Sequence, residues 1–166
     1  MTCCFTGHRQ MEEEERRLAA ATLMQVLEKL YEAGYRRFFS GGALGFDLLA
    51  AECVLRLQAT HSDVHLVMAI PCADQTRTWP QAERDLYDRI CYCADEMNVL
   101  SPHYYQGCMQ VRNKYMVDRS AFCICWLRSM RGGTAYTVSC AVKSGLQVLN
   151  LAVEDLVQQF LMTGMT

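Results

Sequence analysis

Short apolar runs alternate with longer helix-like segments along the whole chain, and this alternation most restricts the fold. Strands that are apolar on both faces belong in a parallel sheet with helices on both sides. The sequence therefore predicts one α/β domain over residues 1–166, doubly wound around a mostly parallel sheet. The predicted strands are 2–6, 35–40, 64–70, 96–101, 121–127 and 146–152. The predicted helices are 11–34, 45–58, 78–94, 109–119, 132–145 and 154–162.

Cysteine is frequent, with 10 residues among 166. The start MTCCFTGHR lacks the basic leader and the long apolar run of a signal peptide. No paired CxxC motifs offer zinc-ligand spacing, and no apolar run reaches the ~20 residues that a membrane span requires. We therefore expect a cytoplasmic protein with reduced, buried cysteines, no metal, no disulfide framework and no membrane segment.

Polar and glycine-rich residues concentrate in the loops that follow the predicted strands. In a parallel sheet, these loops lie at the carboxyl ends of the strands, where ligands bind. The opposite loops are less polar, so we expect the functional site at the carboxyl edge. The loops read TGHR, SGGALGFD, PCADQTRTW, SPHYYQG and RSMRGGT.

Two of these loops carry a glycine pair before a predicted helix. Gly41 and Gly42 form one pair, and Gly132 and Gly133 form the other, followed by Thr134. A helix start presents unpaired N–H groups with a partial positive charge, and glycine lets an anion approach the backbone. A tight turn with an ordinary cap would explain either loop without any ligand. Two such loops on one edge favour phosphate binding.

Charged residues near these loops are further candidates. Arg9 and Arg131 suit a phosphate through their planar guanidinium groups, although either could be a solvated surface charge. Asp47 lies in a first helical turn, where the helix dipole alone favours an acid, but it could also hold a ribose hydroxyl. Arg112 and Asn113 are placed near the start of their helix at the same edge.

The motifs resemble the YpsA-like family of the SLOG superfamily, which includes the DNA-processing protein DprA and the "lonely guy" phosphoribohydrolases. The resemblance rests on TGHR, SGGALGFDLLAAE, Pro71 with Trp79, VRNKYMVD and GGTAYTV, in that order. It implies a Rossmann-like fold and a pocket for a nucleotide or a nucleotide derivative. The implied pocket residues are Thr6, Gly7, His8, Arg9, Gly41, Gly42, Asp47, Arg112, Asn113, Gly132, Gly133 and Thr134.

The chain departs from the phosphoribohydrolases at one position that matters for catalysis. Those enzymes place a glutamate shortly after the glycine–threonine pair, whereas GGTAYTVSCA contains no carboxylate. Cleavage of an N-glycosidic bond passes through an oxocarbenium-like state that a carboxylate stabilises. Asp47 and Glu52 are the candidates to replace it.

Two functional hypotheses follow. The first is a cytosolic module, a ligand sensor, that binds a nucleotide or an ADP-ribose-like molecule and uses no cofactor. The alternative is an enzyme that cleaves the base from a nucleoside monophosphate. Single-stranded DNA binding is disfavoured by the net charge of −2 and by the lack of a strongly basic stretch. The expected partner is a small nucleotide-like molecule. A homo-oligomer is also possible.

Overall fold

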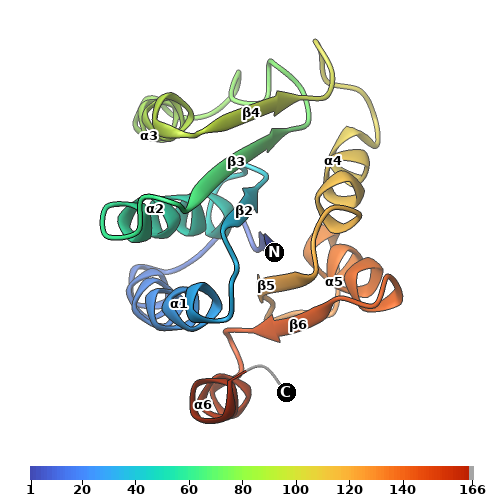
Figure 1. The fold of residues 1–166 in the computed structure, drawn as a ribbon. Coiled ribbons are helices and arrows are strands. Elements are labelled where there is room, and N and C mark those ends of the chain that lie inside the picture. The colour runs from blue at the N-terminus through green and yellow to red at the C-terminus, as the bar shows by residue number, and fades with distance from the viewer. Residues whose placement is uncertain (165–166) are drawn as a thin grey trace.

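The computed structural model describes residues 1–164 and shows one six-stranded sheet (Figure 1). The strands are β1 (Thr2–Gly7), β2 (Arg37–Ser40), β3 (His65–Ile70), β4 (Glu96–Val99), β5 (Phe122–Trp126) and β6 (Gln147–Asn150). Their order is β4-β3-β2-β1-β5-β6, and every neighbouring pair is parallel. The predicted doubly wound α/β fold is confirmed, with a sheet that is parallel throughout.

Helices cover both faces of the sheet. They are α1 (Glu13–Glu32), α2 (Phe46–Gln58), α3 (Gln81–Cys93), α4 (Cys108–Val117), α5 (Gly133–Lys143) and α6 (Glu154–Thr163). In Figure 1, α1, α2, α3 and α6 lie on one side of the sheet, and α4 and α5 lie on the other. Each predicted helix is present, because its apolar spacing and its stop residues are local properties of the sequence.

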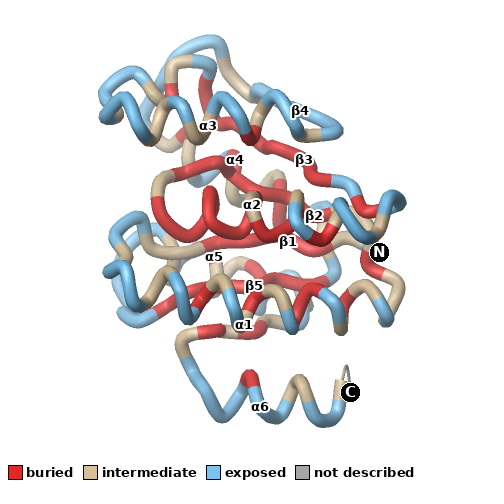
Figure 2. The backbone as a smooth tube through the Cα atoms, turned by 90° about the vertical axis from the view of Figure 1, so that its left-hand side faces the viewer, coloured by how far each residue is buried: buried red, intermediate tan, exposed pale blue. Residues whose placement is uncertain are grey.

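Side chains that alternate along the strands build two cores. In β1, Cys3 and Phe5 point to the larger core beneath α1 and α2, and Cys4 points to the smaller core beneath α4 and α5. Figure 2 shows the buried residues concentrated along the central strands and α2. The cores hold the central strands rigidly, so the loops at their carboxyl ends start from fixed positions.

The strand β4 differs from the expectation that all strands are apolar and covered on both faces. Met97 is 54% exposed and Val99 is 44% exposed. The reason is that β4 is an edge strand with only β3 as a neighbour, and the α4–α5 side of the sheet is covered nearer its centre (Figure 1). An ion pair between Arg37 and Glu96, with 2.6 Å between Nη1 and Oε1, crosses β3 from β2 to this edge.

Helix α3 begins three residues later than predicted. Pro80 lies at the N-cap with an extended backbone (φ −56°, ψ 154°), and Gln81 is the first helical residue. Proline has no N–H to donate, so it fits a helix start, but its extended backbone excludes Thr78 and Trp79 from the helix. Trp79 instead packs edge-on against Tyr87, with 5.6 Å between the ring centroids.

Candidate functional site

The polar loops surround a cavity of about 250 Å³ at the carboxyl edge of the sheet. β1 and β5 are neighbours in the sheet, and the cavity is lined by residues that follow each of them. The helices that follow these strands, α1 and α5, lie on opposite faces of the sheet (Figure 1). Such a crossover point is the usual ligand site of an open α/β sheet. The cavity is lined by Thr6, Gly7, His8, Arg9, Ala43, Asp47, Met109, Arg112, Asn113, Arg131, Gly132, Gly133 and Thr134. All the predicted ligand-binding residues lie here except Gly41 and Gly42.

Asp47 and Arg112 are both buried and both line the cavity. Asp47 is 5% exposed in the first turn of α2, and Arg112 is 4% exposed at the fifth position of α4. Arg112 donates from Nη1 to the Gly41 carbonyl oxygen and, at 3.5 Å, to the Ala69 carbonyl oxygen. A buried guanidinium held by these carbonyls, in the electrostatic field of Asp47, supplies a fixed positive charge at the cavity.

Burial raises the pKa of Asp47 to about 6. The positive charge of Arg112, the amide groups of Ala43 and Gly7, and the charge of Arg9 oppose that rise. Burial lowers the pKa of Arg112, and the charge of Asp47 opposes that fall. Arginine keeps its proton in proteins, so both side chains are charged at neutral pH. On acidification, only Asp47 changes its charge, because its carboxylate becomes protonated.

Three side chains connect this pair to the start of α5. Arg112 Nε donates to Asn113 Oδ1 at 2.6 Å, and Asn113 Nδ2 donates to Thr137 Oγ1 at 2.7 Å. Thr137 Oγ1 in turn donates to the Gly133 carbonyl oxygen at 2.9 Å. The predicted residue Asn113 therefore orients the first turn of α5 as well as lining the cavity.

The start of α5 is open to the cavity. Apart from chain neighbours and the backbone of α5 itself, no atom of residues 1–164 lies within 4 Å of the position that a Cβ atom would take on Gly132 or Gly133. Gly132 has φ +90°, a conformation that glycine adopts without strain, and it provides no side-chain cap. The first N–H groups of a helix have no acceptor within the helix. Together with Thr134, this turn presents backbone donors and a hydroxyl group to an anion.

The start of α2, where a phosphate cradle is predicted at Gly41 and Gly42, packs closely against other parts of the protein. A Cβ atom on Gly41 would overlap the Arg112 guanidinium group and lie 2.7 Å from Asp47 Oδ2. On Gly42, which has φ +63°, it would lie 2.9 Å from Met68 Cε.

The backbone donors at this loop also have partners inside the protein. The Gly42 N–H donates to Ser40 Oγ at 3.2 Å, and the Phe46 N–H donates to the His8 carbonyl oxygen at 3.1 Å. The Ala43 N–H is bonded to Asp47. The glycines at 41 and 42 therefore make room for the Asp47 and Arg112 side chains and for the core, and the Gly42, Ala43 and Phe46 N–H groups are engaged within the protein.

Two further glycines let the first two loops pack together. A Cβ atom on Gly7 would overlap Phe46, and one on Gly45 would overlap the carbonyl groups of His8 and Arg9. This close packing brings the TGHR loop against the start of α2, with Gly7 and Asp47 on one wall of the cavity.

The opening of the cavity carries two exposed arginines, Arg9 and Arg131. Near them, the Arg128 N–H donates to His8 Nε2 at 3.0 Å, which places the imidazole proton of neutral His8 on Nδ1. An ion pair between Arg128 and Glu15 joins the β5–α5 loop to α1. These contacts join the loop that carries Arg131 to the loop that carries Arg9 and to the start of α1.

The two catalytic candidates differ in position. Asp47 lines the cavity, whereas Glu52 lies more than one turn further along α2 and is not part of the lining. Ala43 and Met109 also line the cavity and were not predicted, because neither has a side chain whose chemistry indicates a ligand.

Metal binding and membrane insertion find no support in the geometry of residues 1–164. No group of three or more His, Cys, Asp and Glu side chains among them is arranged to hold a metal ion. None of the helices formed by these residues is both long enough and apolar enough to span a bilayer.

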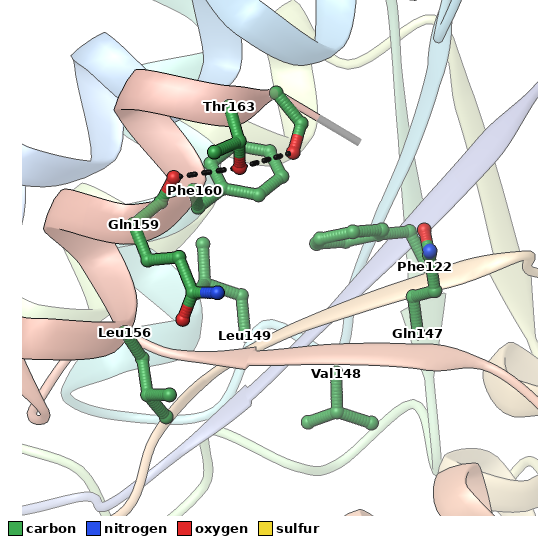
Figure 3. A pocket seen from close by; sticks show the side chains of 9 residues that line it. Phe122, Gln147, Val148, Leu149, Leu156, Gln159, Phe160 and Thr163 are labelled. Carbon is green, nitrogen blue, oxygen red and sulfur yellow. Dashed lines mark hydrogen bonds between the residues drawn. The ribbon is translucent and has the colours of Figure 1, made fainter. Parts of the chain in front are cut away.

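A second hollow of about 270 Å³ lies at the opposite edge of the sheet, between α6 and the starts of β5 and β6 (Figure 3). Phe122 and Phe160 face it, and none of the described residues that line it is charged. The Thr163 hydroxyl group beside it donates to the Gln159 carbonyl oxygen at 2.8 Å. Without charges or open helix starts, this hollow lacks the features that recognise a phosphate.

Sequence comparison identifies a family and two relatives. The model of the YspA SLOG family matches residues 3–156. The UPF0398 protein BH1768 of Halalkalibacterium halodurans is 35% identical over 98 residues, which are 58% of this chain and 52% of that protein. The uncharacterized SPbeta prophage-derived protein YoqJ of Bacillus subtilis is 31% identical over 137 residues, covering 75% of this chain and 80% of YoqJ. The chain thus spans about half the length of the first relative.

Structural comparison finds the same fold in a larger protein. DNA processing protein A (DprA) from Streptococcus pneumoniae superposes with a TM-score of 0.65 and 20% identity, over 98% of this chain and 56% of that chain. At this level of identity, the likeness shows a shared fold and carries no statement about a shared ligand.

Proposed function

Because the chain belongs to the YspA SLOG family, we propose that its cavity binds the phosphate group of a nucleotide or of an ADP-ribose-like molecule. The observation that carries the proposal is the open start of α5, where Gly132, Gly133 and Thr134 face a cavity that also contains arginines. Backbone N–H groups and guanidinium groups are the donors that bind phosphate in proteins.

The residues favour binding over turnover. Arg131 closes over an anion held by the N–H groups of Gly133 and Thr134, and Arg112 adds positive charge from α4. No carboxylate follows Thr134 within its helix, α5. We therefore propose a ligand-binding module, a sensor, that works in the cytosol, where its ten cysteines stay reduced.

The proposal is tested by measuring affinity for phosphorylated ligands. In a thermal-shift screen over nucleotides and ADP-ribose, at least one ligand should raise the melting temperature of the protein. A ligand that binds only the folded state stabilises that state. Gly133→Ala and Thr134→Ala should then each weaken binding of the phosphorylated ligand more than binding of the matching nucleoside. Ser139→Ala, an exposed position on the same helix, serves as the control.

Either of two results would contradict the phosphate assignment. One is equal losses for the phosphorylated and unphosphorylated ligand in the Gly133 and Thr134 variants. The other is a screen in which no phosphorylated ligand changes the melting temperature.

A second function, cleavage of an N-glycosidic bond, is favoured by one observation. Asp47 lines the cavity with a pKa raised to about 6 by burial, and a carboxyl group with a pKa near the working pH is suited to acid–base catalysis. This alternative predicts steady release of free base from a nucleoside monophosphate, lost in Asp47→Asn and kept in Glu52→Gln. Release of free base by the purified protein would show that the protein is an enzyme and would contradict the proposal of a binding module without turnover.

A further inference from the structure

A groove of about 630 Å³ adjoins the proposed phosphate-binding cavity. It runs between the start of α1, the start of α2 and the first turns of α3. Arg9 lines both the groove and the cavity. The chain also passes from one to the other within the β2–α2 loop, since Ala43 lines the cavity and Leu44 lines the groove. The two hollows are therefore neighbours that share Arg9 as a lining residue.

The cavity alone is too small for a whole nucleotide. Pockets that enclose ligands of drug size occupy ~300–1,000 Å³, and the cavity has about 250 Å³. A phosphate bound at Gly133 and Thr134 leaves room for a sugar, so any base must extend beyond the opening. The groove reached through Arg9 is more than twice as large as the cavity and supplies that space.

The groove has the composition that binds a planar heterocycle. Leu44, Leu48 and Leu86 provide apolar surface, and Leu48 belongs to the buried core, so the surface is firmly backed. Arg16, Glu12 and Glu83 also line it and bring one further cation and two carboxylates. Apolar walls with a few polar groups are typical of pockets that bury the faces of a ring and bond its edge.

We propose that this groove holds the base of the nucleotide whose phosphate occupies the cavity, with Arg9 between the two. This inference rests on the proposed function and adds where the base of the ligand lies, in the groove between the starts of α1, α2 and α3. The guanidinium group of Arg9 can contact the phosphate and the ring at the same time, because it donates in its plane and stacks on its face.

The test compares ligands with and without a base on the full chain. Calorimetric titration uses ribose 5-phosphate and the 5′-monophosphates of adenosine, guanosine, cytidine and uridine. At least one nucleotide should bind about tenfold or more tightly than ribose 5-phosphate, since contacts to a stacked base add this much affinity or more.

A variant then blocks the groove without touching the cavity. Ala82 is exposed in the first turn of α3 and lines the groove, so Ala82→Trp fills it. This variant should bind ribose 5-phosphate as the parent does and should lose the added affinity for the nucleotide. Ala21→Trp, at an exposed position of α1 outside the groove, should behave as the parent toward both ligands.

The outcomes separate this inference from the proposed function. If ribose 5-phosphate binds as tightly as every nucleotide, or if Ala82→Trp keeps the full preference for the nucleotide, the base does not occupy the groove and only this inference fails. If neither the sugar phosphate nor any nucleotide binds the parent, the proposed function fails and this inference fails with it. Retained binding of ribose 5-phosphate by Ala82→Trp shows that the variant is folded.

Discussion

At the scale of single residues, the buried pair of Asp47 and Arg112 controls the charge of the site. Gly41 lies against both side chains, so its missing Cβ atom is what lets the pair fit beneath the loop. Arg112 also donates to the Gly41 carbonyl oxygen. A larger residue at position 41 would displace the guanidinium group, because buried positions have no spare volume to receive it.

Asp47 should make the stability of the protein depend on pH. Burial raises its pKa from 3.8 to about 6 in the folded state, so the folded state binds this proton more tightly than the unfolded state. The free energy of unfolding should therefore fall by about 3 kcal/mol from this group as the pH rises from ~4 to ~6, at 1.36 kcal/mol per pKa unit. Asp47→Asn should remove that fall, as measured by urea unfolding at several pH values.

The control for this experiment is Asp88→Asn, an exposed carboxylate in the middle of α3. It should leave the pH profile of the parent unchanged between pH 4 and pH 6. If the Asp47→Asn protein and the parent lose stability in parallel over this range, the carboxyl group of Asp47 does not titrate as its burial indicates.

At the scale of elements, the position of α5 depends on α4. Thr137 is 1% exposed, accepts a hydrogen bond from Asn113 on α4, and donates to the Gly133 carbonyl oxygen in the first turn of α5. The hydrogen bonds run from Arg112 through Asn113 to this turn. The helix start that faces the cavity is thus held by a side chain of its own helix and by the neighbouring helix together.

Thr137→Val should uncouple the two helices. Valine has almost the same shape but no hydroxyl group, so the Asn113 amide loses its acceptor and the Gly133 carbonyl loses its donor. We expect a loss of ~1–3 kcal/mol in the free energy of unfolding, together with weaker binding of phosphorylated ligands. Chemical denaturation and calorimetric titration measure the two effects.

Thr163→Val is the matched control. Thr163 makes the same bond to the carbonyl group four residues earlier, but in an exposed position on α6. This variant should change stability by less than ~0.5 kcal/mol and should leave ligand affinity unchanged. Full affinity in Thr137→Val would show that α5 keeps its position without α4.

At the scale of the whole molecule, two cores on either side of one parallel sheet hold the loops in place. Cysteine contributes to both, with Cys3 in the larger core and Cys4 and Cys123 in the smaller one. Seven of the ten cysteines are buried and all ten are free thiols. They act as small apolar side chains that fill the space between the helices and the sheet.

The buried thiols should therefore be unreactive while the protein is folded. Burial raises the pKa of Cys125 to about 12, and a thiol without its thiolate form reacts slowly. Titration of the reduced, desalted protein should find ten thiols after unfolding, and Cys93, which is exposed, should react first in the folded protein. Added reductant should leave the melting temperature unchanged, and a marked fall would reveal a structural disulfide.

Local pattern alone predicted the elements and the edge of the sheet that carries the site. The spacing of apolar residues decides helix or strand within a few residues, and strand-to-helix loops of a parallel sheet lie on one edge, so Thr6 to Arg9 and Arg131 to Thr134 could be placed together. Arg112 and Asn113 were placed at the same edge from their position near the start of a predicted helix, and their place in the cavity depends on how α4 packs.

Only the tertiary structure decided what surrounds each loop. Gly41 and Gly42 look like Gly132 and Gly133 in the sequence, yet the first pair lies against Arg112 and Met68 and the second pair faces open space. The exposure of β4, the burial of Asp47 and the groove beside Arg9 likewise depend on strand order and helix packing. These features come from contacts between distant segments, and a local pattern carries no information on which segments meet.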